Sequence, residues 1–170
     1  MKPFDPADHP RGDGGRFKAN TRTEPEGGLG TEPASTPKTF RDGWVEWRTP
    51  DEVLHRLDGP AVVTADGTGM WYQHGAVHRV GGPAVIRPDG TEEWWFHDRM
   101  HREDGPAFTA ANGDKEWLCD SQYHRTDGPA IMRTDGTREW WEHGERKPPE
   151  VEAMLTLVWR AKNGETSTQK

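Results

Sequence analysis

The sequence predicts an all-β fold, a single twisted antiparallel meander of stacked hairpins with nine or ten strands, and three observations support it. A unit of 23 residues recurs four times without slippage, with His-Arg at 55–56, 78–79, 101–102 and 124–125. Gly-Pro-Ala and then Asp-Gly or Asn-Gly follow in every unit, and the latter pairs favour a type I′ hairpin turn. Each unit also carries a Trp followed by another large apolar residue. Such periods are typical of repeats that bury surface against their neighbours.

The chain divides into three predicted parts. Residues 1–38 are rich in Gly and Pro and lack periodicity, so we expect a disordered tail. Residues 39–148 form the β-hairpin repeat domain, in which a half repeat at 42–47 precedes the four full repeats. Residues 149–170 are expected to form an amphipathic helix and a short tail, with an apolar stripe of Val151, Met154, Leu155, Val158 and Trp159. The helix either covers an exposed end or face of the sheet or docks a partner.

Side chains alternate between faces along a strand, which assigns different environments to the two members of each large apolar pair. The first members are expected to be structural: Trp71, Trp94, Trp117 and Trp140. The second members Tyr72, Trp95 and Trp141 are expected to be more exposed, unless the helix covers them.

The His-Arg pairs are expected to be structural as well: His55, Arg56, His78, Arg79, His101, Arg102, His124 and Arg125. Each His is expected to pack on a Trp or to bond a turn carbonyl. Three of the Arg residues precede an Asp by two positions, an arrangement that favours an ion pair within the loop. Gly81 replaces that Asp in the second repeat, so Arg79 is expected to be freer than its equivalents.

Composition excludes several functional classes. The net charge is −7, and residues 39–148 carry all of the excess, with 20 acidic against 13 basic residues. An acidic block disfavours direct contact with nucleic acid and with anionic membranes. We find no phosphate-binding Gly-rich motif, no nucleophile–base set and no apolar run that would form a signal peptide or a membrane span. The single Cys119 has no internal disulfide partner. We therefore predict a cytoplasmic, non-catalytic protein without a cofactor.

The ladder of His residues suggests a metal site, but its geometry disfavours one. Successive hairpins are about 10 Å apart, whereas zinc holds its nitrogen ligands at about 2 Å. The pairs His74/His78 and His97/His101 lie on either side of a turn, but the pattern changes to Asp120 with His124 in the next repeat. We predict no metal, and a metal-dependent enzyme using paired His at the turns is retained as an alternative.

The repeat region resembles the MORN-like repeat proteins, on the basis of its Trp, His-Gly and Asp-Gly elements between residues 40 and 147. The HRxDGPA variant is similar to repeats found in bacterial, phage and large-virus proteins. This resemblance implies stacked hairpins and a scaffold or binding function, and it implies no catalytic residues. The segments 9–17 and 23–26 resemble tails of actinobacterial plasmid and phage proteins.

Together these features predict a protein-binding module. Exposed aromatic residues anchor interfaces and acidic residues attract basic partners, so the predicted partner is a host protein with a basic surface. The predicted binding residues are Tyr72, Glu92, Glu93, Trp95, Glu139, Trp141 and Glu142. A sharper hypothesis is a phage- or plasmid-encoded inhibitor of a nucleic-acid-handling defence enzyme, a CRISPR effector or a restriction enzyme. A structural repeat protein is a further alternative.

Overall fold

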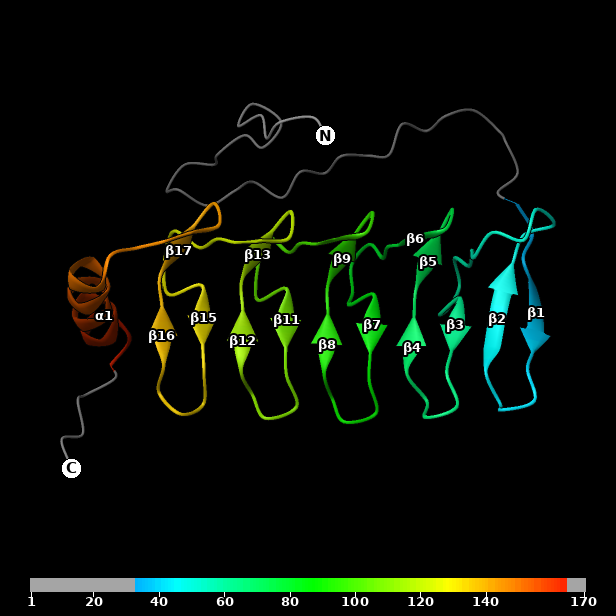
Figure 1. Cartoon of the computed structure of the whole chain (residues 1–170), viewed down its shortest axis with the longest axis horizontal. Coiled ribbons are helices and arrows are strands. Elements are labelled where there is room, and N and C mark those ends of the chain that lie inside the picture. Colours follow the sequence, from blue (N-terminus) through cyan, green and yellow to red (C-terminus); the bar gives the residue numbers. More distant parts are fainter. Residues whose placement is uncertain (1–32, 165–170) are drawn as a thin grey trace. The chain divides into compact units, whose positions relative to one another are not determined.

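The computed structural model describes residues 33–164, which form a ten-stranded antiparallel meander followed by one helix (Figure 1). The large sheet consists, in order, of β1 (Thr36–Thr39), β2 (Val45–Arg48), β3 (Val62–Val63), β4 (Gly69–Met70), β7 (Val85–Ile86), β8 (Glu92–Glu93), β11 (Phe108–Thr109), β12 (Lys115–Glu116), β15 (Ile131–Met132) and β16 (Arg138–Glu139). This confirms the predicted fold class. Each full repeat contributes two adjacent strands, so the hairpins follow one another in sequence order across the sheet.

Each repeat forms a second, smaller hairpin that the sequence analysis did not separate from the first. These hairpins pair β5 (Tyr72–Gln73) with β6 (Ala76–Val77), β9 (Trp95–Phe96) with β10 (Arg99–Met100), β13 (Leu118–Cys119) with β14 (Gln122–Tyr123), and β17 (Trp141–Glu142) with β18 (Glu145–Arg146). They lie along one edge of the large sheet (Figure 1). A Trp stands at the junction of the two hairpins in every repeat, as Trp71 does between β4 and β5.

The two turns of each repeat have different geometries, and the predicted type I′ assignment is wrong for the Asp-Gly turns. In the first repeat Gly67 has a φ of 89° and its N–H donates to Thr64, while Asp66 has no positive φ. This geometry is that of a three-residue hairpin loop with one left-handed glycine. The turns of the small hairpins instead place two successive residues at positive φ, such as His74 and Gly75 (49° and 82°), as a type I′ turn requires.

The core is thin and lies between the repeats. The Ala of each Gly-Pro-Ala segment is fully buried, at Ala61, Ala84, Ala107 and Ala130. Its carbonyl accepts the backbone N–H of the Trp in the hairpin before it, as Ala107 does from Trp94 at 2.7 Å. A methyl side chain is the largest group that such close approach of two backbones admits. This explains why Gly-Pro-Ala recurs at the same place in each unit.

Helix α1 (Pro149–Asn163) closes the C-terminal end of the repeat array. Its Glu152 is buried, and the carboxylate oxygen Oε1 accepts the backbone N–H of Trp140 at 2.9 Å. In the preceding repeats this N–H donates to an Ala carbonyl, so Glu152 replaces the acceptor that a further repeat would supply. Thr156 accepts the indole N–H of Trp140 at 3.0 Å. Helix α1 therefore covers the exposed end of the sheet, the first of the two roles considered for it.

The face that α1 presents to the sheet differs from the predicted stripe. Met154 and Val158 were expected to be buried, but 59% and 62% of their surfaces are exposed. The buried side instead centres on Glu152 and Thr156, because the last Trp needs polar partners there. Gly164 ends the helix in the left-handed conformation.

Most of the predicted N-terminal tail lies outside the described residues. Its boundary at residue 38 is nevertheless too late, because Thr36–Thr39 form β1 and pair with β2. Within residues 33–164 no helix has the length and apolar character needed to cross a bilayer.

Candidate functional site

The His-Arg-x-Asp-Gly-Pro loops hold an arginine between a Trp ring and a glycine. In the third repeat the guanidinium carbon of Arg102 lies 3.8 Å from the ring centroid of Trp94. On its other side, a Cβ added at Gly105 would lie only 2.8 Å from that carbon, so a larger residue would displace the guanidinium. Arg102 Nε donates to Asp104 at 2.8 Å, which lowers the pKa of that carboxyl group. This loop motif is a structural clamp, as predicted.

The clamp recurs with little variation. Arg56 stacks on Trp47 at 4.0 Å and Arg125 on Trp117 at 3.9 Å. In both cases Nε donates to the Asp two residues later, at 2.8 and 2.7 Å. Trp47 belongs to the half repeat, so the role of this segment is to supply the ring for the first clamp.

The second repeat departs from this pattern. Arg79 stacks on Trp71 at 4.0 Å and donates to the carbonyl of Pro83 at 3.0 Å. Gly81 stands in place of the Asp and has a left-handed φ of 75°. Among residues 33–164, Arg79 therefore has no carboxylate on Nε, in agreement with the sequence expectation.

The ladder histidines bind turns of the small hairpins. The Nδ1 atoms of His55, His78 and His124 accept the backbone N–H of His74, His97 and His143, at 3.1, 3.3 and 3.2 Å. The two rings of each pair also lie together, with centroids 4.2 Å apart for His78 and His97. These contacts join histidines that are 19 positions apart within one repeat. The bond goes to a turn N–H through Nδ1, where a turn carbonyl was expected.

The third repeat brings together a different set of donors at the same place. His101, Cys119 and Asp120 offer ligand atoms that all lie within 4.8 Å of one another. Burial, together with the negative charges of Asp120 and Glu103, raises the pKa of the Cys119 thiol to about 11. The group is chemically suited to a borderline metal such as zinc. The equivalent positions in the neighbouring repeats are Phe96 and His97 or Glu142 and His143, so the arrangement is not a property of the repeat.

One face of the large sheet carries alternating glutamate and apolar side chains. The strand register aligns Val85, Glu93, Phe108, Glu116 and Ile131 in one row across β7 to β15. The row continues to Glu139 in β16.

Aromatic side chains of the small hairpins lean onto this row. The indole N–H groups of Trp95 and Trp141 donate to Glu93 and Glu139, each at 2.9 Å. The Tyr123 hydroxyl donates to Glu116 at 2.9 Å. We call the surface formed by Tyr72, Trp95, Tyr123 and Trp141 with these glutamates the aromatic–carboxylate face.

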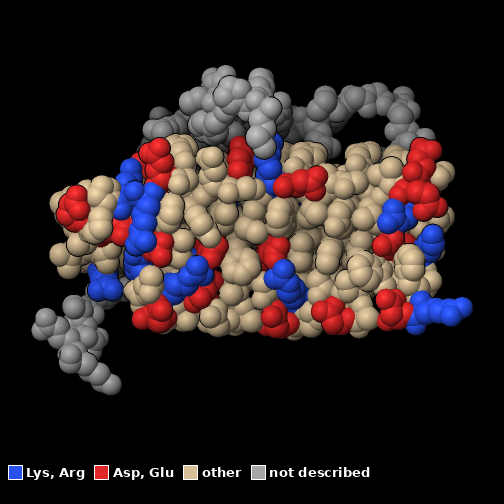
Figure 2. Space-filling view, in the orientation of Figure 1, with Lys and Arg blue, Asp and Glu red and all other residues tan. Residues whose placement is uncertain are grey.

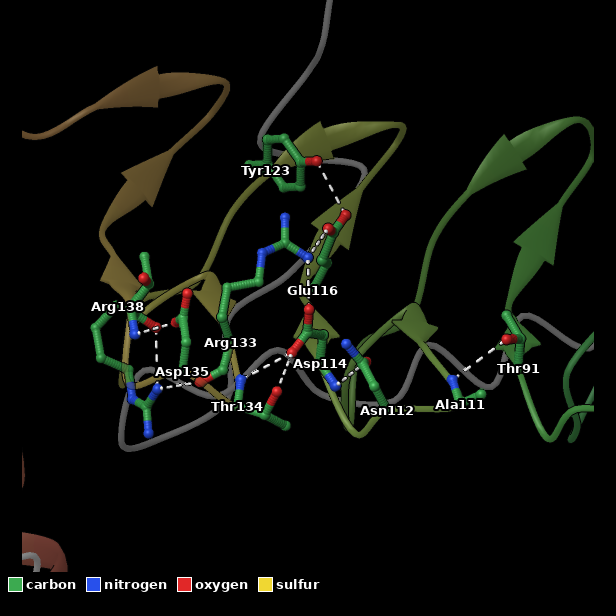
Figure 3. Close-up of polar contacts among 11 residues, drawn as sticks. Thr91, Ala111, Asn112, Asp114, Glu116, Tyr123, Arg133, Thr134, Asp135 and Arg138 are labelled. Atoms are coloured by element: carbon green, nitrogen blue, oxygen red, sulfur yellow. Dashed lines mark hydrogen bonds and ion pairs between the residues drawn. The ribbon is translucent and has the colours of Figure 1, made fainter.

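Arginine residues neutralise much of this row. Arg133 reaches Glu116 at 2.7 Å and Asp114 at 3.6 Å, while Asp114 accepts the N–H of Thr134 (Figure 3). Arg87 pairs with Glu93 in the same way, at 2.5 Å. The glutamates of this face therefore hold the hairpins together as well as contributing charge.

The structure brings together five of the seven predicted binding residues. Glu93, Trp95, Glu139 and Trp141 belong to the aromatic–carboxylate face by direct contact. Tyr72 is assigned to it because it is the repeat equivalent of Trp95 and lies near Glu46, which belongs to the same row. Glu92 points to the opposite face because it neighbours Glu93 in β8, and Glu142 is paired with Lys147.

Burial differs from expectation in two respects. Glu93 is buried, so its carboxylate is much less available to a partner than was expected. Trp94 and Trp95 are both half-buried, so this pair does not show the expected difference, whereas Trp140 is buried and Trp141 half-buried, as expected. The sequence analysis also missed Tyr123, because Leu118 occupies the usual aromatic position in the third repeat. Tyr123 pairs directly with Leu118 across β13 and β14, a contact that depends on the small hairpin.

The acidic charge that remains gathers at the Asp-Gly turns. Acidic side chains follow the lower edge of the sheet in Figure 2, where Figure 1 shows the turns that join the paired strands. Asp66, Asp89 and Asp135 each accept the backbone N–H of a Thr two residues later, at 3.1, 2.8 and 2.8 Å. Hydrogen bonds lower the pKa values of all three carboxyl groups. The main donor to Asp66 is the side chain of Thr64, and the main donors to Asp89 and Asp135 are the backbone N–H groups of Thr91 and Thr137. They stay ionised and form an acidic edge beside the aromatic–carboxylate face.

Comparison with known proteins shows no matching family model and no matching curated protein.

Proposed function

We propose that the repeat domain is a non-catalytic protein-binding module that docks through its aromatic–carboxylate face. The observation that carries this proposal is the row of half-buried aromatic residues on one face: Tyr72, Trp95, Tyr123 and Trp141. Because one hairpin repeat spans about 10 Å, the row offers anchors at regular intervals along a sheet. Aromatic anchors of this kind dominate the binding energy of many interfaces.

The acidic edge supplies the long-range attraction in this proposal. Asp66, Asp89 and Asp135 are ionised at neutral pH and exposed. Charges at the rim of an interface mainly accelerate association with a partner of opposite sign. The preferred partner is therefore a protein with a basic surface. A nucleic-acid-handling enzyme of a host, such as a CRISPR effector or a restriction enzyme, has the required surface, and this protein would act on it as an inhibitor.

The test measures association and dissociation rates with a purified enzyme of this class at several salt concentrations. The triple variant Asp66→Asn/Asp89→Asn/Asp135→Asn removes three charges. The turns should persist, because the third repeat already uses Asn112, whose side-chain oxygen accepts the N–H of Asp114 at 3.0 Å. We expect this variant to associate more slowly and to lose much of its salt dependence, since exposed charges are screened over about 8–10 Å near physiological ionic strength.

A second variant addresses the anchors. Trp141→Ala should raise the dissociation rate with little change in association, as loss of an aromatic anchor does. Leu157→Ser is a matched control, because Leu157 is exposed on α1 and does not belong to the aromatic–carboxylate face. Unchanged rates in both the triple variant and Trp141→Ala would contradict the proposal.

The metal-dependent enzyme remains the second candidate, favoured by the cluster of His101, Cys119 and Asp120. Metal content after purification decides between them. If each chain holds one zinc or iron tightly and His101→Ala loses both the metal and any catalytic turnover, the enzyme is favoured over the binding module.

A further inference from the structure

We propose that the groove between the first and second His-Arg loops binds a carboxylate, presented by a partner protein next to an apolar side chain. The groove has a volume of about 560 Å³ and lies between the loops of repeats one and two. Its wall includes Leu57, Asp58, Trp71, Arg79 and Val80. The carboxylate of Asp58 is held by Arg56 Nε at 2.8 Å. Trp71 packs over Gly69, on the sheet face opposite to the row that contains Met70 and Glu93, so this site is distinct from the aromatic–carboxylate face.

The other three loops show what Arg79 lacks. Arg56, Arg102 and Arg125 each hold an Asp carboxylate on Nε, at 2.7 to 2.8 Å. Arg79 has the same stack on a Trp ring and the same bond to a Pro carbonyl, but Gly81 brings no carboxylate. The guanidinium is thus held in the conformation that receives a carboxylate in the other repeats. A group positioned in advance binds a ligand at a lower entropic cost than a flexible one.

The surroundings of Arg79 specify the rest of the ligand. Leu57 and Val80 occupy the variable position of their loops and expose 54% and 69% of their surfaces. The same position is Glu103 and Thr126 in the next two loops, so only the first two of the four loops carry an apolar residue there. An acidic residue with an apolar neighbour therefore matches both features. A carboxylate is preferred over other anions because that is the group held at the equivalent atom in three repeats.

The experiment uses nuclear magnetic resonance titration of the full chain with three short probes. N-acetyl-Leu-Asp amide carries one carboxylate, N-acetyl-Leu-Asn amide is its neutral counterpart, and inorganic phosphate is a general anion. We expect the Asp probe to shift the indole N–H signal of Trp71 and the amide signal of Gly82. The Asn probe should bind about tenfold more weakly, the effect of losing one charge-assisted pair.

Two variants use the repeats as matched controls. Gly81→Asp restores the usual loop sequence and should abolish the response of Trp71 by placing a carboxylate on Arg79 from within the chain, once the loop backbone leaves the left-handed φ of 75° that Gly81 adopts. Asp104→Gly vacates the third loop and should add a response at the indole of Trp94, the ring on which Arg102 stacks. If Gly81→Asp fails to fold, the comparison of the Asp and Asn probes and the gain at Trp94 still decide the result.

Several results would overturn the proposal. Equal binding of the Asp and Asn probes would remove the role of the carboxylate, and tighter binding of phosphate would indicate a general anion site. Retention of the Trp71 response in folded Gly81→Asp would exclude Arg79 as the anchor. If Gly81→Asp changes the association state of the protein, the occupant of the groove is a second copy of the chain. If it shifts the signals of residues 1–32, the occupant is the chain's own N-terminal segment. The two proposals fail separately because the two sites lie on different faces. If Trp141→Ala did not raise the dissociation rate, the proposed function would be contradicted, but the binding of the Asp probe at this groove would not.

Discussion

Gly105→Ala tests the arginine clamp directly, because the added methyl group occupies the place of the Arg102 guanidinium. The Cβ would lie 2.8 Å from Arg102 Cζ and 3.0 Å from Nε. Gly105 has no positive φ, so the backbone itself accepts alanine without strain. The guanidinium must therefore move away from Trp94 and Asp104, and the cost of the substitution is the loss of those contacts.

The size of the effect follows from the contacts that are lost. The stack on Trp94 is worth about 0.5–1 kcal/mol, the exposed pair with Asp104 about 0.2–1 and the bond to the Pro106 carbonyl about 0.5–1.5. Replacing Gly by Ala restores about 0.4–1 kcal/mol, because alanine restricts the unfolded chain. We expect a net destabilisation of about 1–2 kcal/mol, which lowers the Tm by about 2–8 °C for a chain of this size.

The decisive comparison is the same substitution in an Arg102→Ala background. Once the guanidinium is absent, Gly105→Ala should no longer destabilise the protein and should instead stabilise it by about 0.4–1 kcal/mol. A double-mutant cycle by urea unfolding measures this reversal of sign as a coupling energy. If Gly105→Ala has the same effect with and without Arg102, the clamp does not explain the glycine and the reasoning is refuted.

Three further results are expected. Glu152→Ala should destabilise the protein by about 1–3 kcal/mol in thermal unfolding, because the buried Trp140 N–H loses its acceptor, whereas Glu152→Gln should lose less. The Cys119 thiol should react slowly with iodoacetamide at pH 8 and faster as the pH approaches its pKa of about 11, and rapid reaction at pH 8 in the folded state would contradict this. The pKa of Asp135 is lowered by folding, so its contribution to stability is present above the ordinary value of 3.8 and declines as pH falls below it. Asp135→Asn should reduce that acid sensitivity, as measured by unfolding between pH 2 and 6, and an unchanged pH profile would speak against it.

The repeat sequence by itself determined the order of strands in the meander. A period of 23 residues with turn residues at constant positions places each hairpin beside the next, and antiparallel neighbours need only short connections. The role of Arg56, Arg102 and Arg125 as loop stitches was also readable, because a partner two residues away is a local interaction. The exception at Arg79 followed from the same local rule.

Other features depended on contacts between distant residues. The stack of arginine on tryptophan joins residues that are eight or nine positions apart, and the histidine bonds join residues 19 apart. Alternation along a strand does not reveal such contacts when the chain bends at a Trp between two short hairpins. For this reason the sequence did not reveal that His55 contacts the turn at His74, or that Tyr123 joins the aromatic row.

The C-terminal helix shows most clearly where the sequence stops being informative. Its existence and its ends could be predicted from Pro149, the apolar spacing and Gly164. The face it buries was decided by the last repeat, whose Trp140 presents an N–H with no following Ala carbonyl to accept it. A buried donor without an acceptor is costly, and Glu152 supplies the acceptor from the side of α1 that contacts the last repeat, while Met154 and Val158 are exposed. Helical periodicity identified an amphipathic segment, but only the tertiary structure determined that a carboxylate was the group to be buried.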